Sequence, residues 1–375
     1  MTADPRPLVA VLFGGMSGEH QISCATAGGV LGAIDEEKWQ TFAIGITPDG
    51  QWVPMPSDPL AYVLGDDGGY TVEAGDLRVA ILPGSPRLIQ FEVDDGGHPV
   101  PETVRTIGDI DVLFPLLHGP YGEDGTVQGL LELSKVRYVG CGVASSAVCQ
   151  DKYLTKTVLG AAGIDVGEWV AFTQRDWLGD QQEWEAQVAA LGFPVFVKPC
   201  RAGSSLGVSR VDAAADLAAA LDEAMRHDPR VIVEAACPGR EVECGVLGTA
   251  DGSLSASAIG EIRVLTEGFY DYESKYFAPQ AVQLDCPADL PEDVARAIQK
   301  IALVAFEAVE GEGISRIDFF YNEESGRIVL NEINTLPGFT PGSLYPVMFD
   351  RVGITYPELV SALLEEAAAR PVGLR

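Results

Sequence analysis

Apolar runs and helix-like stretches alternate over the first 142 residues, and this alternation is the strongest constraint on the fold. Four runs are typical of buried strands: LVAVLF (8–13), QTFAIGIT (40–47), DVLFPLLHG (111–119) and VRYVGCG (136–142). VQGLLELS (127–134), before the last of them, is typical of a helix. Strands that alternate with helices form a parallel sheet with helices on its faces. We therefore expect an α/β, doubly wound parallel sheet here. The Gly-, Pro- and Asp-rich segment 53–105 has no clear place in it.

After residue 142 the pattern changes to α+β. We expect helices at 151–163, at 211–227 with Asp212 as its N-cap, and at 291–311 with a proline near the first turn. Strands are expected at 193–199, 230–236 and 255–264. A β-hairpin is expected from 314–322 and 327–334, because a Glu-Glu-Ser-Gly turn separates the two strand-like runs.

Composition excludes several classes of protein. The chain has 375 residues, 47% of them hydrophobic, so a sizeable core and two or three domains are expected. A formal net charge of −30 argues against nucleic acid or an anionic membrane as partner. If the substrate is a phosphate ester, local lysines, arginines, metal ions and backbone N–H groups must overcome this negative field.

The cysteines and the apolar runs indicate a cytoplasmic protein. Seven cysteines are scattered without a C-x-x-C pair, which is typical of reduced thiols, and four histidines make zinc improbable. The first apolar run has no basic region before it and is strand-sized, so it is not expected to be a signal peptide. No run approaches the ~18 apolar residues of a membrane span.

The expected hairpin carries a group of polar side chains on apolar strands. Arg316 and Asp318 share one face of the first strand, and Glu332 and Asn334 share one face of the second. If even positions pair with even positions, all four side chains meet. Three hard oxygen ligands without His or Cys favour Mg²⁺ or Mn²⁺. The alternative is a solvated hairpin face with a surface ion pair.

Two Gly-rich segments lie where ligands bind in α/β proteins. KPCRAGSSLGVSRV (198–211) follows a strand, precedes an expected helix and could fold over phosphates, with Lys198 as a point charge; a plain flexible hairpin is the alternative. It is not a G-x-x-x-x-G-K-[ST] loop.

The second segment, FGGMSGEHQIS (13–23), lacks the G-x-G-x-x-G spacing of dinucleotide sites. Glu19 falls at the carboxyl end of a strand, as a ligand-binding group or as a helix-dipole carboxylate.

Two further loops have both a functional and a plain interpretation. LLHGPYGEDGTVQG (116–129) contains His118, and a lone histidine is by default a structural one. EGFYDYESKYFAP (267–279) is long, polar and aromatic, which is typical of a lid over a site. An ordinary surface loop is the alternative.

Taken in order, these segments resemble the D-alanine–D-alanine ligase family, which has the ATP-grasp fold. The resemblance covers nearly the whole chain outside about 53–105 and is carried by seven motifs: GGMSGEHQIS, LHGPYGEDGTVQG, GCGVASSAVCQDKYLTK, FVKPCRAGSSLGVSRV, FYDYESKY, SRIDFF and NEINTLPGFTPGSLYP. It implies an N-terminal substrate-binding α/β domain (1–150), a central ATP-grasp subdomain (151–236) and a C-terminal ATP-grasp catalytic domain (237–375).

The resemblance implies a role for each matching residue. The ATP phosphates would be contacted by Lys152, Lys198 and the 203–205 loop, and the γ-phosphate also by Lys275. Glu241 would bind the ribose. Glu234 would hold the adenine together with the backbone that follows it. The implied ATP-binding residues are Lys152, Lys198, Ser204, Ser205, Glu234, Ala235, Cys237, Glu241, Lys275, Asn331 and Glu332. The implied ligands of two Mg²⁺ or Mn²⁺ ions are Asp318, Glu332 and Asn334. Many relatives carry Lys and then Leu or Ile where this chain has Ala235-Ala236-Cys237, which leaves only a backbone role there.

The remaining implied residues belong to D-alanine and to catalysis. Those at D-alanine are Glu19, His118, Arg316, Gly338, Ser343 and Leu344. Those in catalysis are Glu19, Ser204, Tyr276, Arg316, Gly338 and Ser343. Tyr276 follows the lysine of the lid, where relatives that make an ester instead of a dipeptide carry Phe or His.

The implied activity is ATP-dependent ligation of two D-alanines through D-alanyl phosphate, by a cytoplasmic homodimer, for peptidoglycan precursors. The D stereochemistry rests on the resemblance. The alternatives are a D-alanine–D-lactate ligase and a non-catalytic nucleotide-binding protein on the same scaffold. The retained set of Arg316, Asp318, Glu332 and Asn334 argues against the second. A nicotinamide dehydrogenase is weaker still, because the glycine fingerprint is absent.

Overall fold

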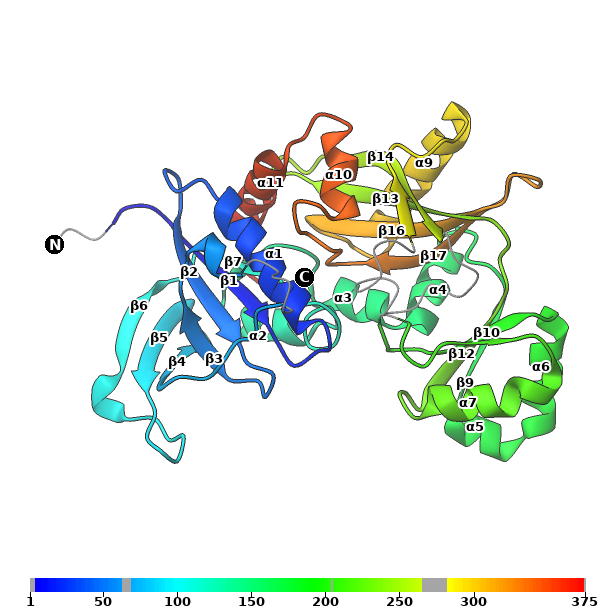
Figure 1. Cartoon of the computed structure of the whole chain (residues 1–375), viewed down its shortest axis with the longest axis horizontal. Coiled ribbons are helices and arrows are strands. Elements are labelled where there is room, and N and C mark those ends of the chain that lie inside the picture. Colours follow the sequence, from blue (N-terminus) through cyan, green and yellow to red (C-terminus); the bar gives the residue numbers. More distant parts are fainter. Residues whose placement is uncertain (1–3, 63–68, 204, 265–281, 374–375) are drawn as a thin grey trace.

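The computed structural model describes residues 4–62, 69–203, 205–264 and 282–373. Figure 1 shows three lobes: the first is mainly blue to cyan, the second is green, and the third is mainly yellow to orange, with the green helices α3 and α4 beside it. Each lobe is built on its own sheet, and the third lobe lies between the other two. The limits of the three domains stay a prediction.

The first lobe confirms the predicted parallel sheet. Its strand order is β3-β2-β1-β7-β8, and β1 runs parallel to β2 and β7, β7 runs parallel to β8, and β3 is an antiparallel edge. The elements are β1 (Leu8–Gly14), α1 (His20–Ala33), β2 (Gln40–Ile46), β3 (Trp52–Met55), β7 (Val112–Pro115), α2 (Thr126–Leu133) and β8 (Arg137–Tyr138). The expected strands at 111–119 and 136–142 are shorter than predicted, because the chain leaves the sheet at Leu116 and Val139.

The segment that could not be placed from the sequence forms most of a small separate sheet. Its antiparallel order is β4-β5-β6, from β4 (Leu77–Ile81), β5 (Arg87–Glu92) and β6 (Arg105–Asp109), with the short 3₁₀ helices η1 (Pro59–Tyr62) and η2 (Pro101–Thr103) beside it. Leu88 and Val79 pack with β1 and β2 residues in one core, so this sheet covers one face of the parallel sheet.

The second lobe is a four-stranded antiparallel sheet in the order β11-β10-β12-β9, covered by helices. Its elements are β9 (Trp169–Thr173), α5 (Gln174–Gly179), α6 (Gln181–Leu191), β10 (Val195–Pro199), β11 (Ser209–Val211), η3 (Ala214–Asp216), α7 (Leu217–Met225) and β12 (Arg230–Ala235). The predicted helix at 211–227 is wrong at its start. Val211 pairs with Val195 in the sheet, so α7 begins at Leu217, and Asp212 accepts from Arg210 instead of capping a helix.

The third lobe is a five-stranded antiparallel sheet in the order β15-β14-β13-β16-β17. Its elements, with the helices that pack on it, are α3 (Val143–Gln150), α4 (Lys152–Ala161), β13 (Arg240–Gly248), β14 (Leu254–Val264), β15 (Val282–Asp285), α9 (Glu292–Ala308), β16 (Ile314–Tyr321) and β17 (Ile328–Asn334). The predicted hairpin is confirmed as β16 and β17.

The end of the chain returns to the first lobe. Helices α10 (Leu344–Asp350) and α11 (Tyr356–Ala369) pack in one core with α1 and β1. Phe339 has no exposed surface, and its ring lies 5.9 Å from Phe114, 5.9 Å from Tyr345 and 5.4 Å from Tyr356, measured between ring centroids. This aromatic contact fixes the loop after β17 between the first and third lobes.

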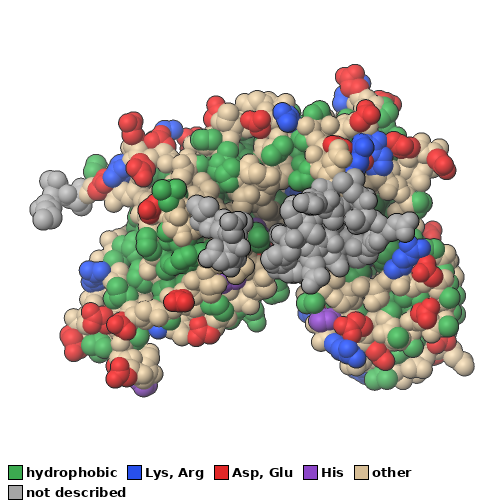
Figure 2. Space-filling view, in the orientation of Figure 1, with side chains coloured by type: hydrophobic (Ala, Val, Ile, Leu, Met, Phe, Trp, Pro, Cys, Tyr) green, Lys and Arg blue, Asp and Glu red, His purple; other side chains and the backbone are tan. Residues whose placement is uncertain are grey.

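The surface reflects the acidic composition. Figure 2 shows Asp and Glu side chains on both halves of the visible face, with fewer Lys and Arg among them. Among the helices within the described ranges, none is long and apolar enough to cross a membrane.

The loop before α2 provides a test of packing. A Cβ at Gly122 would lie 2.1 Å from the Leu117 carbonyl oxygen, whereas a Cβ at Gly129, inside α2, would meet nothing within 4 Å. We expect Gly122→Ala to lower the free energy of unfolding by about 1–3 kcal/mol, because the backbone must move. Gly129→Ala is the matched control and should raise it by about 0.5–1 kcal/mol. Equal urea-unfolding midpoints for the two variants would contradict this packing.

Candidate active site

A cavity of about 510 Å³ lies where the three lobes meet. Among the residues that line it are Glu19 and His118 from the first lobe, Lys198 from the second, and Asp318 and Glu332 from the third. Segments far apart in the sequence therefore converge on one space, at the carboxyl end of β1.

The cavity floor is the hairpin face predicted from the sequence. Arg316 pairs with Asn334 and Asp318 pairs with Glu332, so even positions do face even positions, as expected. Glu243 of β13 lies opposite Asp318 on the other side. Three carboxylates from three adjacent strands thus form one row across the sheet.

Arg316 lies between two of these carboxylates. Its Nε and Nη2 each donate to Asp318 at 2.7 Å, and Nε lies 3.0 Å from Glu243 Oε2. The Asn334 amide also donates to Asp318, at 2.9 Å. Glu243 was missed from the sequence. It lies two residues after Glu241 on β13, so the two side chains point to the same face of the sheet.

The donor set of this face fits a hard cation. Two carboxylates and one carboxamide supply oxygen ligands, and phosphate oxygens and water could complete the coordination. Burial, together with the neighbouring Asp318 and Glu332, raises the pKa of Glu241. Within the described part of the chain, no three His, Cys, Asp or Glu side chains are already gathered for a metal ion. Arg316 and Asn334 hold Asp318 instead.

The wall opposite this floor is a buried lysine cluster. Glu234 accepts from Lys198 Nζ at 2.7 Å and lies 3.3 Å from Lys156 Nζ. Burial alone would raise the pKa of Glu234, but Lys156 and Lys198 lower it to about 2. The Glu234 carboxylate thus forms ion pairs with two lysines, and its predicted contact with adenine stays a prediction.

Lys156 was missed from the sequence. It is 4% exposed, and its Nζ also donates to the Val166 carbonyl at 2.7 Å. Its position four residues after Lys152 on α4 was the available signal, because residues four apart share one helix face.

The glycine-rich loop differs from its predicted context. It joins β10 to β11, two antiparallel strands, and so precedes a strand instead of a helix. It nevertheless lines the cavity through Ala202, Gly203 and Ser205, and Lys152 Nζ donates to the Ala202 carbonyl at 2.8 Å.

The end of β12 faces the same cavity. Ala235 and Cys237 line it, together with Glu241 and Asn331. The N–H groups of Ala235 and Ala236 already donate to the carbonyls of Glu168 and Pro194, at 3.0 and 3.1 Å. A base bound here would therefore use other groups at this strand end.

The first-lobe side of the cavity contains the predicted D-alanine residues. Glu19 takes the N-cap position of α1 without a side-chain cap bond. His118 is buried, with Nδ1 3.2 Å from the Leu336 carbonyl, which fits a structural histidine that also lines the cavity. Leu344 is buried beside them. A Cβ at Gly338 would lie 3.3 Å from Ser343 Oγ, so glycine lets this backbone approach the serine.

Glu123 ties the two loops on this side together and was also missed. Its carboxylate accepts from the N–H of Gly119 at 2.8 Å and from the N–H of Leu336 at 3.1 Å. It therefore couples the loop after β7 to the loop after β17.

Most of the predicted site residues line this one cavity: Glu19, His118, Lys152, Lys198, Ser205, Glu234, Ala235, Cys237, Glu241, Arg316, Asp318, Asn331, Glu332, Asn334, Gly338, Ser343 and Leu344. Ser204, Lys275 and Tyr276 lie outside the described residues, as does the predicted lid at 267–279. The individual roles stay predictions.

Comparison with known proteins gives one family. The family described as D-ala D-ala ligase N-terminus matches residues 8–141, and the one described as D-ala D-ala ligase C-terminus matches residues 158–365. The chain is 48% identical to a D-alanine–D-alanine ligase of Kineococcus radiotolerans over 100% of both chains. It is 47% identical to the ligase of that name from Pseudarthrobacter chlorophenolicus, over 99% of this chain and 96% of the relative.

Solved structures agree with this likeness. The D-alanine–D-alanine ligase from Coxiella burnetii has a TM-score of 0.78 and 34% identity, over 97% of this chain and 94% of the other. The VanG D-Ala:D-Ser ligase from Enterococcus faecalis has a TM-score of 0.80 and 32% identity, over 96% and 99%. The predicted ATP-grasp fold is confirmed.

The lysine cluster predicts an acid-sensitive contribution to stability. The folded pKa of Glu234, about 2, lies below its ordinary 4.5, so its stabilisation is complete above about pH 4.5 and is lost as the pH falls towards 2. Glu234→Gln leaves two buried lysines without their carboxylate and should lower the free energy of unfolding by about 3–5 kcal/mol at pH 7. Urea unfolding from pH 7 to pH 2 should show the two proteins converging at the acid end. A constant difference across this range would contradict the assignment.

Proposed function

The chain belongs to the D-alanine–D-alanine ligase family, and from this membership we propose that it joins two D-alanines into D-alanyl-D-alanine at the expense of ATP. The proposal rests above all on one cavity that brings lysines, an acidic row and an arginine together. A non-catalytic nucleotide-binding protein need not retain an oxyanion donor such as Arg316. D-alanyl phosphate would be the intermediate, because a free carboxylate is too poor an electrophile to form an amide at neutral pH.

The nucleotide would lie between the second and third lobes. Lys152, Lys198 and the loop at 203–205 would bind its phosphates, with Lys275 added at the γ-phosphate. Glu241 and the end of β12 would hold the ribose and the base, with Asn331 nearby. Local positive charge of this kind overcomes the repulsion of an acidic protein for ATP.

Asp318, Glu332 and Asn334 would hold two Mg²⁺ or Mn²⁺ ions. When bound, such ions neutralise charge on the phosphates during transfer. Asp318 would then share its carboxylate between Arg316 and a metal ion, because each carboxylate oxygen has a second lone pair. Glu243 remains as the carboxylate that keeps the guanidinium in the site.

The amino-acid substrates would lie on the first-lobe side. Glu19, His118, Ser343 and Leu344 would surround the first D-alanine. Arg316 and the Gly338 N–H would stabilise the oxyanion that forms when the second amine attacks. Tyr276 would join Glu19 and Ser204 in a hydrogen-bonded triad across the closed site. We further propose a homodimer that works in the cytoplasm.

D-alanine is the second substrate that the similarities favour. The VanG structure is named a D-Ala:D-Ser ligase, so this fold by itself admits another second substrate. Relatives that are 46–48% identical to this chain are named D-alanine–D-alanine ligases. A D-alanine–D-lactate ligase is the remaining alternative.

One assay tests both the activity and the second substrate. The purified protein should release ADP from ATP only when D-alanine is present, which separates a ligase from a nucleotide-binding protein. With equal D-alanine and D-lactate at pH 7 to 8, mass spectrometry should find mainly the dipeptide. The attacking amine must be neutral, so dipeptide yield should rise with pH, whereas a hydroxyl nucleophile carries no ammonium penalty.

Tyr276→Phe should shift the product of this assay towards the ester, most visibly at lower pH. Mainly ester from the unmodified protein would rule out the assignment to D-alanine. An unchanged product ratio in the variant would rule out the role given to Tyr276.

Asn334 offers a test of the metal face. Asn334→Leu should keep the thermal unfolding midpoint within a few degrees and lower kcat roughly a hundredfold or more, because a group that positions charge for phosphoryl transfer is lost. Asn322→Leu, at the turn end of the same hairpin, is the matched control and should leave kcat near normal. Normal turnover in the Asn334 variant would remove this residue from the metal site.

A further inference from the structure

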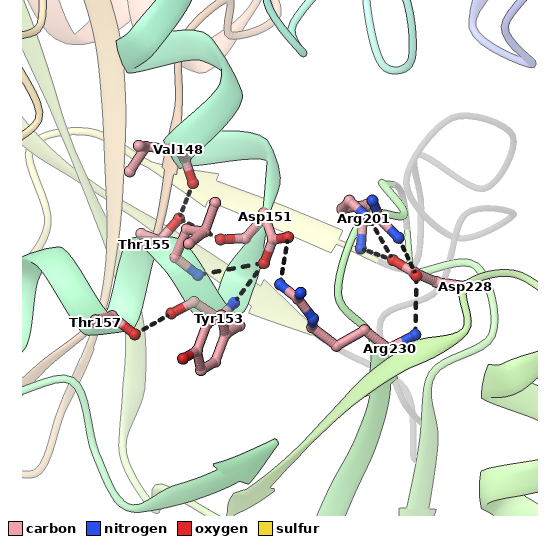
Figure 3. Close-up of polar contacts among 9 residues, drawn as sticks. Val148, Asp151, Tyr153, Thr155, Thr157, Arg201, Asp228 and Arg230 are labelled. Atoms are coloured by element: carbon pink, nitrogen blue, oxygen red, sulfur yellow. Dashed lines mark hydrogen bonds and ion pairs between the residues drawn. The ribbon is translucent and has the colours of Figure 1, made fainter. Parts of the chain in front are cut away.

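Asp228 gathers N–H groups from two separate segments of the second lobe. It is 3% exposed and lies in the turn before β12. Its carboxylate accepts from Arg201 three times, from N and Nε at 2.9 Å and from Nη2 at 2.6 Å, and from the Arg230 N–H at 3.0 Å. Figure 3 shows the two arginines on either side of it. Burial opposes its ionisation, but the Arg201 bonds bring the pKa of Asp228 below its ordinary value.

The segment that Asp228 holds is the root of the glycine-rich loop. Arg201 follows Cys200 directly after β10. The Lys152 N–H donates to the Cys200 carbonyl at 3.0 Å, and Lys152 Nζ donates to the Ala202 carbonyl at 2.8 Å. The carbonyls on both sides of Arg201 are therefore docked on the lysine at the start of α4.

A second contact fixes the start of α4 to the same place. Asp151 caps the helix by accepting from the N–H groups of Tyr153 and Leu154, at 3.0 and 3.2 Å. Arg230 Nη1 lies 3.5 Å from Asp151 Oδ2, and its guanidinium carbon lies 5.0 Å from the centre of the Tyr153 ring. The dashed line in Figure 3 between Asp151 and Arg230 marks this contact.

We propose that Asp228 is a positioning residue for nucleotide binding, which acts through Arg201 to fix the root of the 200–208 loop against Lys152. This inference rests on the proposed function, in which Lys152 and the loop both bind the phosphates of ATP. Neither Asp228 nor Arg201 is among the described residues that line the cavity, so neither is placed to touch the nucleotide.

The physical reason is the conformational entropy of the loop. A phosphate-binding loop must be ordered when the nucleotide binds, and each residue freed beforehand makes that step more costly. With Arg201 held by Asp228, the root of the loop keeps its alignment with Lys152 and need not be ordered on binding. Without Asp228, the root of the loop has to be ordered as well, and its alignment with Lys152 is lost.

Isothermal titration calorimetry of the full-length protein with ATP and with adenosine tests this inference. Asp228→Asn should weaken ATP binding roughly tenfold, which corresponds to fixing about one further residue on binding. Adenosine has no phosphates, so its affinity should stay unchanged. In steady-state assays the KM for ATP should rise by a similar factor, with little change in kcat or in the KM for D-alanine.

Three further variants separate positioning from a loss of stability. Arg201→Ala removes a side chain that is 53% exposed and leaves the backbone N–H groups of Arg201 and Arg230 bonded to Asp228, so it should fold. It should weaken ATP binding in the same direction as Asp228→Asn. Arg201→Lys keeps the positive charge but cannot make the bidentate contact with Asp228. Its affinity for ATP should lie between those of the unmodified protein and Arg201→Ala. Glu366→Gln, which breaks a buried pair with Arg370 near the C-terminus, is the matched control and should lower stability without changing ATP affinity.

The outcomes are distinct. Equal ATP affinity in the unmodified protein, Asp228→Asn and Arg201→Ala would overturn the inference. So would an equal loss of adenosine and ATP binding, or an equal effect of Glu366→Gln, because each indicates general destabilisation. If the unmodified protein fails to bind ATP at all, the proposed function falls, and this inference falls with it.

Discussion

The register of three strands determines what this cavity can do. Glu243, Asp318 and Glu332 lie side by side on β13, β16 and β17, and Arg316 and Asn334 form the next pair along the hairpin. A slip of one residue would turn the moved strand's polar side chains to the other face of the sheet and bring apolar ones in their place. The β-bulge between Asp318 and Phe319 ends this pattern just beyond Asp318. Charge placement in the site is therefore a consequence of backbone pairing.

Local charge balance explains how so acidic a chain can have a phosphate site. Glu234 forms ion pairs with both Lys156 and Lys198, and the Ala202 carbonyl accepts from Lys152. These contacts make it possible to bury lysines, whose ammonium groups would otherwise lose their hydration at great cost. Phosphate oxygens could bind the same lysines, because they carry negative charge as the Glu234 carboxylate does.

Much of this arrangement could be predicted from the sequence, because it depends on short-range patterns. Strand alternation correctly predicted the parallel sheet and the facing side chains of the hairpin. The helix predicted from Asp212 was wrong because Val211 is recruited into the sheet by Val195, a tertiary contact that no local pattern shows. Glu123 was missed for a similar reason, since it is identified by its bonds to Gly119 and Leu336. Lys156 and Glu243 did have a local signal, because they share a face with Lys152 and Glu241, but their bonds across the fold show what they do.

Three residues that sequence analysis did not single out, Phe339, Glu123 and Asp228, share one task, which is to fix the roots of loops that line the cavity. Phe339 packs the loop after β17 into the first core, Glu123 bonds that loop to the one after β7, and Asp228 holds the loop after β10. A ligase must surround its substrates and still release the product, so loop tips need freedom while loop roots do not. Fixing the roots confines the entropy lost on closure to the few residues that touch the substrate. Buried groups outside the cavity can thereby influence affinity without contacting any ligand.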